Sequence, residues 1–232
     1  MNKQPKIPDE LKKKFEQLKL KLDKFKKKVL KEFSEYIIGI ALLPPKEDNK
    51  EAINVLVLVD DSDSKKMSKF ELKDKLSKII IKFAEEVDKN INVETLILTE
   101  LKENCFDGKY EILQLIAMSA PIYDPKDMLA AVKIAEVHKS MVLKKFEKYI
   151  VSYVAAGSLF RGDKKANDID VFIIVDDTDV KRMSRYELKE RLRYIIIEQG
   201  YQAKEITGVN KDFHVQTYIL TDFWDAVKDA HP

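Results

Sequence analysis

Two short motifs in the second half of the chain combine residue types that suit phosphate and metal chemistry. Gly157-Ser158 is followed, after a loop of nine residues, by Asp168-Ile169-Asp170, which opens an apolar run. Residues two apart in an extended strand point to the same face, so we expect the two carboxylates to project together beside the Gly-Ser turn. Such a pair suits two divalent cations about 4 Å apart, the arrangement used for in-line phosphoryl transfer. Asp168 and Asp170 are therefore the candidate metal ligands.

The turn and the loop after it offer groups that suit a phosphate. Glycine at position 157 lets the backbone approach a phosphate closely, and Ser158 adds a hydroxyl and an N–H donor. Arg161, Lys164 and Lys165 are expected to meet the remaining negative charge. A Gly-Ser pair or an Asp-x-Asp on its own is usually a turn or a strand end. Together they indicate a site, because two Asp residues on an apolar strand are costly to desolvate without a cation or hydrogen bonds.

This combination resembles the signature of the polymerase-β-like nucleotidyltransferase superfamily. The likeness is carried by Gly157-Ser158, the nine-residue loop with Arg161-Gly162, and Asp168-Ile169-Asp170. It implies a mixed sheet with helices packed on one side, Mg²⁺ (or Mn²⁺) held by Asp168 and Asp170, and a nucleoside triphosphate such as ATP whose phosphates lie over the Gly-Ser turn. The implied enzyme transfers a nucleoside monophosphate to an acceptor hydroxyl and releases pyrophosphate.

The chain departs from the family at a third carboxylate, which usually comes from a neighbouring strand and helps to activate the attacking hydroxyl. The candidate strand covers residues 212–218, and strand alternation places Asp212, His214 and Gln216 on one face. Asp212 is the only carboxylate but stands at the strand entrance, so the central position is expected to hold His214 or Gln216. A histidine there can replace a general base by accepting a proton near neutral pH, and a structural role is the alternative.

An internal repeat organises the elements that must position these groups. Residues 55–81 align without a gap on residues 171–197, and more than half of the aligned positions are identical. Each copy is expected to contain a long helix, a strand, a second strand buried on both faces, a helix that begins at a Ser-x-x-Glu capping box, and a third strand. The long helices are expected over about 8–33 and 125–148, each beginning where a proline suits the first turn.

The repeat predicts an α+β chain of two tandem nucleotidyltransferase-like units, each a small mixed β-sheet with helices packed on it. We expect the units to cover residues 1–123 and 124–232 and to pack as an internal pseudo-dimer. Copy one continues through residues 110–123, whereas copy two ends near the point that matches Lys109, so its C-terminal edge is expected to be truncated.

Copy one has lost the chemistry of copy two. Ala52 and Asn54 stand where copy two has Asp168 and Asp170, and residues 42–45 replace the Gly-Ser turn with Leu-Leu-Pro-Pro. Because hard cations need oxygen ligands that preferably carry charge, copy one is expected to bind no metal there. The acidic clusters at 60–63 and 176–179 persist in both copies, so we interpret them as structural turns rather than cation sites.

Composition limits the classes of function. The chain has 232 residues, with 42 Lys and Arg against 40 Asp and Glu, and a net charge of +2, so generic polycationic binding of nucleic acid is not indicated. The single cysteine, the lack of a signal-peptide core and the lack of a long apolar run predict a cytoplasmic protein with no membrane partner. The basic run in the first helix is interpreted as a solvated face, with RNA binding as the alternative. Phe223 and Trp224 are expected to pack in the core, with base stacking as the alternative.

The leading hypothesis is a metal-dependent nucleotidyltransferase whose acceptor is an RNA, a protein or a small molecule. The alternative is a catalytically inactive nucleotide- or RNA-binding module, or an antitoxin-like regulatory partner. The sequence leaves the acceptor, the preferred base and the oligomeric state open.

Overall fold

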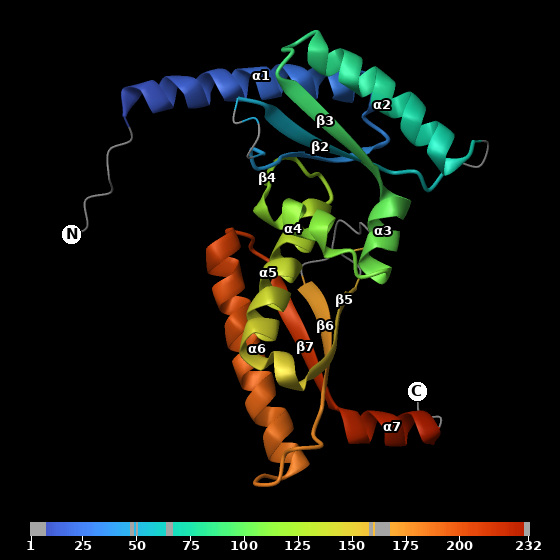
Figure 1. The fold of residues 1–232 in the computed structure, drawn as a ribbon, viewed down its shortest axis with the longest axis vertical. Helices are drawn as coiled ribbons and strands as arrows, with labels where there is room; N and C mark the ends of the chain where they lie inside the picture. The colour runs from blue at the N-terminus through green and yellow to red at the C-terminus, as the bar shows by residue number, and fades with distance from the viewer. Residues whose placement is uncertain are drawn as a thin grey trace. The chain divides into compact units, whose positions relative to one another are not determined.

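A computed structural model describes residues 8–46, 49, 51–63, 67–157, 160 and 168–229. The chain forms two compact units, Met1–Pro125 and Lys126–Pro232, and Figure 1 shows the elements of each. Among the helices of the described ranges, none combines the length and apolar character that a membrane span needs.

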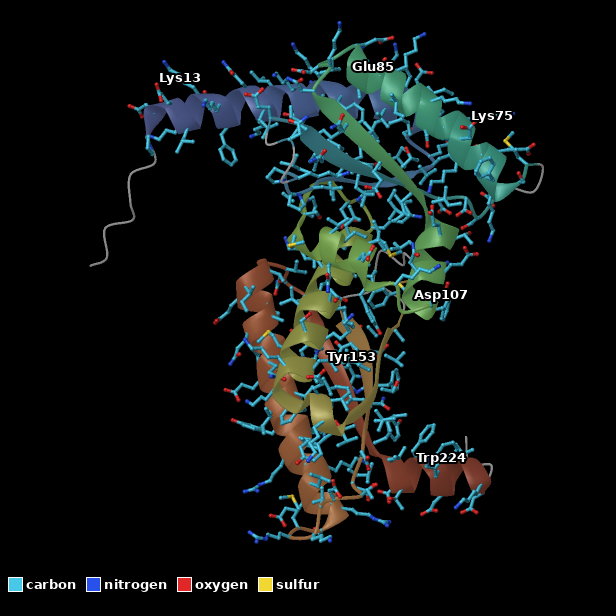
Figure 2. All side chains as sticks on the ribbon, in the orientation of Figure 1. Lys13, Lys75, Glu85, Asp107, Tyr153 and Trp224 are labelled. Atoms are coloured by element: carbon cyan, nitrogen blue, oxygen red, sulfur yellow. The ribbon has the colours of Figure 1, made fainter. Side chains whose placement is uncertain are left out.

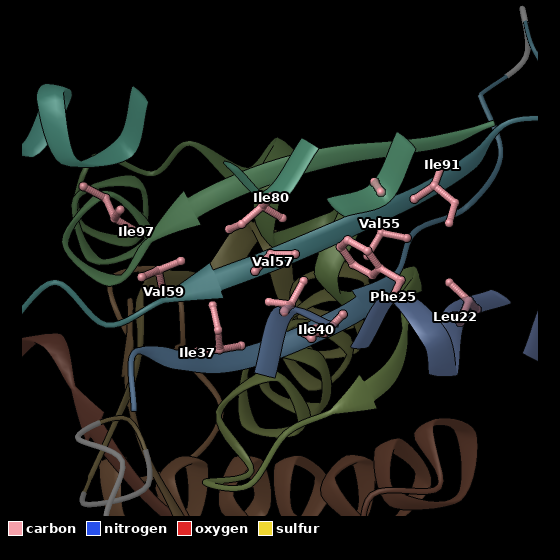
Figure 3. Close-up of a cluster of buried hydrophobic side chains, with 12 residues drawn as sticks. Leu22, Phe25, Ile37, Ile40, Val55, Val57, Val59, Ile80, Ile91 and Ile97 are labelled. Carbon is pink, nitrogen blue, oxygen red and sulfur yellow. The ribbon is translucent and has the colours of Figure 1, made fainter. Parts of the chain in front are cut away.

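The first unit is a four-stranded mixed sheet with helices packed on it. Its elements are α1 (Asp9–Phe33), β1 (Ile37–Leu42), β2 (Ile53–Val59), α2 (Lys69–Glu85), β3 (Ile91–Ile97), α3 (Leu98–Phe106), α4 (Tyr110–Met118) and β4 (Ala120–Tyr123). The strand order is β3-β2-β1-β4; β1 runs antiparallel to β2 and β4, and β2 runs parallel to β3. Phe25 of α1 and Ile80 of α2 pack with Ile40, Val55 and Val57 of the sheet in one buried cluster (Figure 3).

The second unit is a three-stranded mixed sheet. Its elements are α5 (Met128–Phe146), a 3₁₀ turn (Glu147–Tyr149), β5 (Ile150–Ala156), β6 (Asp168–Val175), α6 (Arg185–Thr207), β7 (Asp212–Ile219) and α7 (Leu220–Lys228). The strand order is β5-β6-β7, with β5 antiparallel and β7 parallel to β6. Ile134 of α5 and Ile196 of α6 pack with Ile169, Val171 and Ile173 of β6. The predicted α+β class, with two small mixed sheets and helices packed on them, is confirmed.

The two units share their topology down to single hydrogen bonds. β1 and β5 each carry a register shift near their start, at Ile37/Gly39 and Ile150/Ser152. Immediately beyond β2, the Asp60 N–H donates to the Tyr36 carbonyl at 2.7 Å, and the Asp176 N–H makes the matching bond to the Tyr149 carbonyl at 2.8 Å. Similar sequences therefore fold to the same local geometry in both units.

The acidic clusters act as caps for the helices that follow the third strands. Asp61 Oδ1 accepts from the Thr99 N–H at 3.0 Å, and Asp177 Oδ1 accepts from the Thr221 N–H at 3.2 Å. Thr99 and Thr221 each lie in the first turn of a helix, where backbone N–H groups have no partner within the helix. These bonds support the structural interpretation of both clusters.

Helix boundaries differ in part from the sequence prediction. Pro8 is the N-cap of α1 rather than its first helical residue. Helix α5 begins only at Met128, after Asp127 adopts a left-handed φ of 53°, so Pro125 lies outside the helix. The predicted capping box is present at α2, where Ser68 accepts from the Glu71 N–H and the Glu71 side chain accepts from the Ser68 N–H. At α6, Ser184 caps the helix by accepting from the Glu187 N–H.

The prediction that β6 is buried on both faces is wrong, although it holds for β2. Ile169, Val171, Ile173 and Val175 are buried, whereas the alternating Asp168 is exposed and Asp170, Phe172 and Ile174 are partly exposed. The buried residues belong to the cluster formed with α5 and α6, so these helices cover one face of the sheet. The other face is open to solvent and carries both aspartates.

Two further expectations concern surfaces. Lysines of the basic helix α1 form ion pairs, among them Lys21 with Asp88 and Lys28 with Glu86, which agrees with a solvated face. The prediction that Trp224 packs in the core is wrong, because this side chain is 53% exposed on α7 (Figure 2). It makes an edge-to-face contact with Phe223, with ring centroids 5.8 Å apart.

Candidate active site

The candidate site lies on the open face of the second unit, at the beginning of β6. Asp168 and Asp170 flank the buried Ile169, so both carboxylates lie on the open face, as the alternation predicts. In the parallel register with β7, Asp168 is opposite Asp212 and Asp170 is opposite His214. These four side chains therefore share one face of two adjacent strands.

Gly157 brings the end of β5 against Asp170. Ala156 pairs with Asp170 in the antiparallel register, and Gly157 follows with a φ of +110°, a conformation that other residues rarely adopt. A Cβ atom at Gly157 would lie 2.7 Å from Asp170 Oδ2, closer than real contacts allow. Glycine is needed here both for its backbone conformation and for the approach of the Asp170 carboxylate.

His214 lies directly opposite Asp170 on the neighbouring strand β7. Its Nδ1 lies 3.2 Å from Asp170 Oδ1. The His214 side chain is 60% exposed and that of Asp170 is 34% exposed, so both remain accessible to a ligand from solvent. Asp170 thus contacts the Gly157 turn through one oxygen and His214 through the other.

The other two candidates on β7 are engaged elsewhere. Lys204 of α6 lies 2.5 Å from Asp212 Oδ1, and the Asp212 side chain is 75% exposed at the start of the strand. Gln216 Oε1 accepts a hydrogen bond from the Tyr218 hydroxyl at 2.8 Å. A catalytic role for Asp212 stays a prediction, and the structure shows it in an ion pair rather than beside Asp170.

The predicted phosphate-binding loop is only partly described. Ser158, Arg161, Lys164 and Lys165 lie outside the described residues, so their contribution stays a prediction. Residues 137–231 match the family model of the nucleotidyltransferase domain. This segment is therefore similar to a nucleotidyltransferase domain. It contains Gly157, both aspartates and His214, in agreement with the resemblance drawn from the motifs. No curated protein and no solved structure matches the chain.

The oxygen donors of this segment fit a cation whose coordination is completed by phosphate oxygens of a ligand. Within the ranges that the structure describes, no group of three or more His, Cys, Asp or Glu side chains is gathered to hold a metal ion. Mg²⁺ in phosphate-binding sites is usually held by one or two carboxylates together with phosphate oxygens. Asp168 and Asp170 supply such a pair of carboxylates.

The first unit has a neutral pair at the matching register. Asn54, which corresponds to Asp170, is only 5% exposed. Its side-chain amide donates to the Pro44 carbonyl at 3.4 Å, and its Oδ1 accepts from the Asn92 amide at 3.4 Å. Asn92 lies opposite Asn54 on β3, as His214 lies opposite Asp170 on β7. Amides and a proline-containing segment therefore stand where the second unit has Asp170, His214 and Gly157.

A buried histidine, which the sequence reasoning missed, supports the strands of the site from the covered face. His138 Nε2 lies 2.9 Å from the Ile196 carbonyl, so this nitrogen donates, and Nδ1 accepts from the Tyr153 hydroxyl at 2.8 Å. Burial lowers the pKa of His138 to about 4 and raises the pKa of Tyr153, so both side chains are neutral at pH 7. The ring of Phe213, the neighbour of His214, packs 4.4 Å from that of His138. A histidine on the apolar face of α5 was the available signal.

Proposed function

We propose that the chain is a metal-dependent nucleotidyltransferase that transfers a nucleoside monophosphate from a nucleoside triphosphate to an acceptor hydroxyl, with release of pyrophosphate. The observation that carries this proposal is the convergence on Asp170. One of its oxygens lies against Gly157, and the other faces His214. The convergence occurs inside the segment that matches the nucleotidyltransferase family.

Each residue of the site has a distinct task in this proposal. Asp168 and Asp170 hold the divalent cation together with phosphate oxygens of the substrate. Gly157 keeps the end of β5 free of side-chain atoms, so that a phosphate can approach the backbone. A bound cation would supply Lewis-acid stabilisation of the charge on the transferred phosphoryl group. His214 stands in the place of the third carboxylate, and its action as a proton acceptor stays a prediction.

The first unit serves as a degenerate scaffold in this proposal. The buried Asn54 and the exposed Asn92 are joined by an amide hydrogen bond, and Asn54 also donates to the Pro44 carbonyl. A neutral amide pair offers a hard cation no charged ligand. We therefore assign nucleotide chemistry to the second unit alone.

A second candidate function is supported by the histidine at the third position. Without a carboxylate there, the domain would bind nucleotide and cation without transferring a nucleotidyl group, as a regulatory module or an antitoxin-like partner would. The two candidates differ in turnover. They share the binding site and its residues.

The deciding experiment incubates the chain with each α-labelled nucleoside triphosphate, a divalent cation, and RNA, protein or small-molecule acceptors in turn. The proposed enzyme labels an acceptor and releases pyrophosphate, and Asp170→Asn abolishes both. Asp179→Asn is the matched control, because Asp179 lies beyond the opposite end of β6. Stoichiometric triphosphate binding without pyrophosphate release, over all acceptors, would establish the binding module instead.

A further inference from the structure

We propose that the outer edge of β5, together with the apolar part of the open sheet face beside it, is a docking surface for a partner protein that presents an amphipathic helix followed by an apolar strand. The strand of the partner pairs antiparallel with β5. The inference goes beyond nucleotidyl transfer, because the surface lies at the opposite end of the open face from the two candidate metal ligands.

The open face of the second unit divides into a charged part and an apolar part. The candidate metal ligands stand at the beginning of β6, whereas Phe172 and Ile174 continue the same face toward the end of the strand and are partly exposed. Val154 lies opposite Phe172 and is 49% exposed, and Tyr218 lies opposite Ile174 and is 37% exposed. Apolar side chains that gather on one exposed face are typical of an interaction surface.

The outer edge of β5 is open to strand addition. In the order β5-β6-β7, no strand of the described ranges pairs with β5 on the side away from β6 (Figure 1). Such an edge offers backbone N–H and C=O groups to an incoming strand. Val151 and Val154, each about half exposed, place apolar side chains along it. Residues 150–156 contain none of the lysines or prolines with which proteins commonly block strand addition.

The first unit shows what the equivalent edge accepts. β4 pairs antiparallel with β1 on the side away from β2, so that Ala41 lies opposite Pro121. The repeat and the strand registers make Ala41 the counterpart of Val154. Ala41 is fully buried, whereas Val154 is half exposed. Within the described ranges, the same topology therefore ends in a paired edge in one unit and an open edge in the other.

The helix of the partner is inferred from α3 and α7, the helices that follow the third strands. In the first unit, α4 contacts α3 and leads directly into β4. In the second unit, α7 follows directly from β7 and carries Trp224 and Val227, both more than half exposed. Trp224 stands where α3 has Lys102, and Val227 stands where α3 has Cys105. α7 thus presents an apolar surface that an amphipathic helix can cover.

A helix–strand segment explains both exposed features at once. Pairing of β5 with β5 of a second copy would engage the edge but would supply no segment that corresponds to α4. A segment with the chemistry of residues 110–123 would pair with β5 through its strand and cover α7 through its helix, as α4 and β4 do for α3 and β1. We therefore assign the surface to a partner of this kind rather than to a second copy.

The fluorescence of Trp224, the single tryptophan of the chain, reports occupation of the surface. The probe is a synthetic peptide with the sequence of residues 110–123, which contains no tryptophan, added to the full chain. Binding should shift the Trp224 emission to shorter wavelength, and titration gives the Kd. A peptide of the same composition in scrambled order should cause no shift.

Two matched variants locate the binding. Val154→Lys places a charge at the edge of β5 and should weaken peptide binding at least about tenfold. Ile206→Lys replaces an exposed apolar residue of α6 and should leave the Kd unchanged. Circular dichroism and thermal unfolding of both variants establish that the fold is retained.

Hydrogen exchange of the full chain tests the strand pairing itself. With the peptide bound, outward-facing amides among residues 151–155 should exchange at least about tenfold more slowly than in the free chain. Sedimentation of the free chain gives its oligomeric state.

The outcomes separate this inference from the proposed function. Absence of peptide binding, binding that persists in Val154→Lys, or protection that excludes β5 would each overturn it. A dimer of the free chain with β5 already protected would assign the edge to a second copy and overturn it as well. All of these results leave the nucleotidyltransferase proposal standing, because none involves a nucleotide or a cation. An emission shift with protection of β5, lost in Val154→Lys and kept in Ile206→Lys, establishes the inference.

Discussion

Gly157 and Asp170 are packed so closely that the glycine has no space for a side chain: an added Cβ would lie 2.7 Å from the carboxylate oxygen Oδ2. The contact links the end of β5 to the first residues of β6, which pairs with it in antiparallel register. It places the Asp170 carboxylate beside the residue at which β5 ends.

We expect Gly157→Ala to abolish cation-dependent binding of triphosphate. The methyl group would displace the Asp170 carboxylate, and the φ of +110° would add strain of about 1–3 kcal/mol to the folded state. Calorimetric titration measures binding, and urea unfolding measures stability.

Gly208→Ala is the matched control for that variant. Gly208 has a φ of +67° at the end of α6, and an added Cβ would meet no atom within 4 Å. It should lose about 1–2 kcal/mol of stability from backbone strain and keep full triphosphate binding. Equal loss of binding in both variants would attribute the effect to strain rather than to the contact with Asp170.

Asp168→Asn and Asp170→Asn should each remove cation-dependent binding of triphosphate and leave the fold intact. Both substitutions keep the size of the side chain and remove a charged oxygen ligand. Titration with triphosphate and Mn²⁺ measures the binding, and circular dichroism measures the fold. Asp212→Asn is the comparison: because Asp212 is exposed and paired with Lys204, its loss should change the affinity little. Loss of binding in Asp212→Asn with retention in Asp170→Asn would reassign the metal ligand.

The stability of the second unit should fall between about pH 6.5 and pH 4 because of His138. Its pKa is lowered from 6.5 to about 4 by burial, so in this range the unfolded chain takes up a proton that the folded chain excludes. The part of the unfolding free energy that depends on a neutral His138 is fully present above pH 6.5 and is lost as the pH falls through about 4. This loss is on the order of 3 kcal/mol. His138→Gln removes the titrating group. Urea unfolding of both proteins across this range should show a steeper decline in the wild type, and parallel pH profiles would contradict the assignment.

Asp177→Ala should destabilise the second unit by about 1–3 kcal/mol without affecting triphosphate binding. The Asp177 carboxylate accepts from both the N–H and the hydroxyl of Thr221, so its removal leaves first-turn groups of α7 without their partner. Hydrogen exchange at the Thr221 amide should accelerate in the variant. Asp179→Ala, which removes a neighbouring carboxylate of the same cluster, should leave this exchange rate unchanged.

The sequence predicted the parts of the site that depend on local pattern and failed where tertiary contacts decide. Strand alternation correctly placed Asp168 and Asp170 on one face of β6. The burial of β6 was wrong, because an apolar run does not reveal whether helices cover one face or both. The pairing of Asp212 with Lys204 links residues of different elements, and no spacing along the chain indicates it. The same holds for His138, whose partners come from β5 and α6.

The paired asparagines of the first unit also bear on how a fold can exchange activity for stability. Asn54 is buried and hydrogen-bonded to neutral partners, whereas the Asp170 side chain is partly exposed and lies beside the exposed His214. A functional site commonly retains groups that the fold alone would not favour, and removal of the functional demand permits more stable replacements. Asn54 and Asp170 lie at corresponding positions of β2 and β6, each opposite a residue of a parallel neighbouring strand, so the two can be compared within one chain. Comparing the unfolding free energies of Asn54→Asp and Asp170→Asn would measure how much stability such a site gives up.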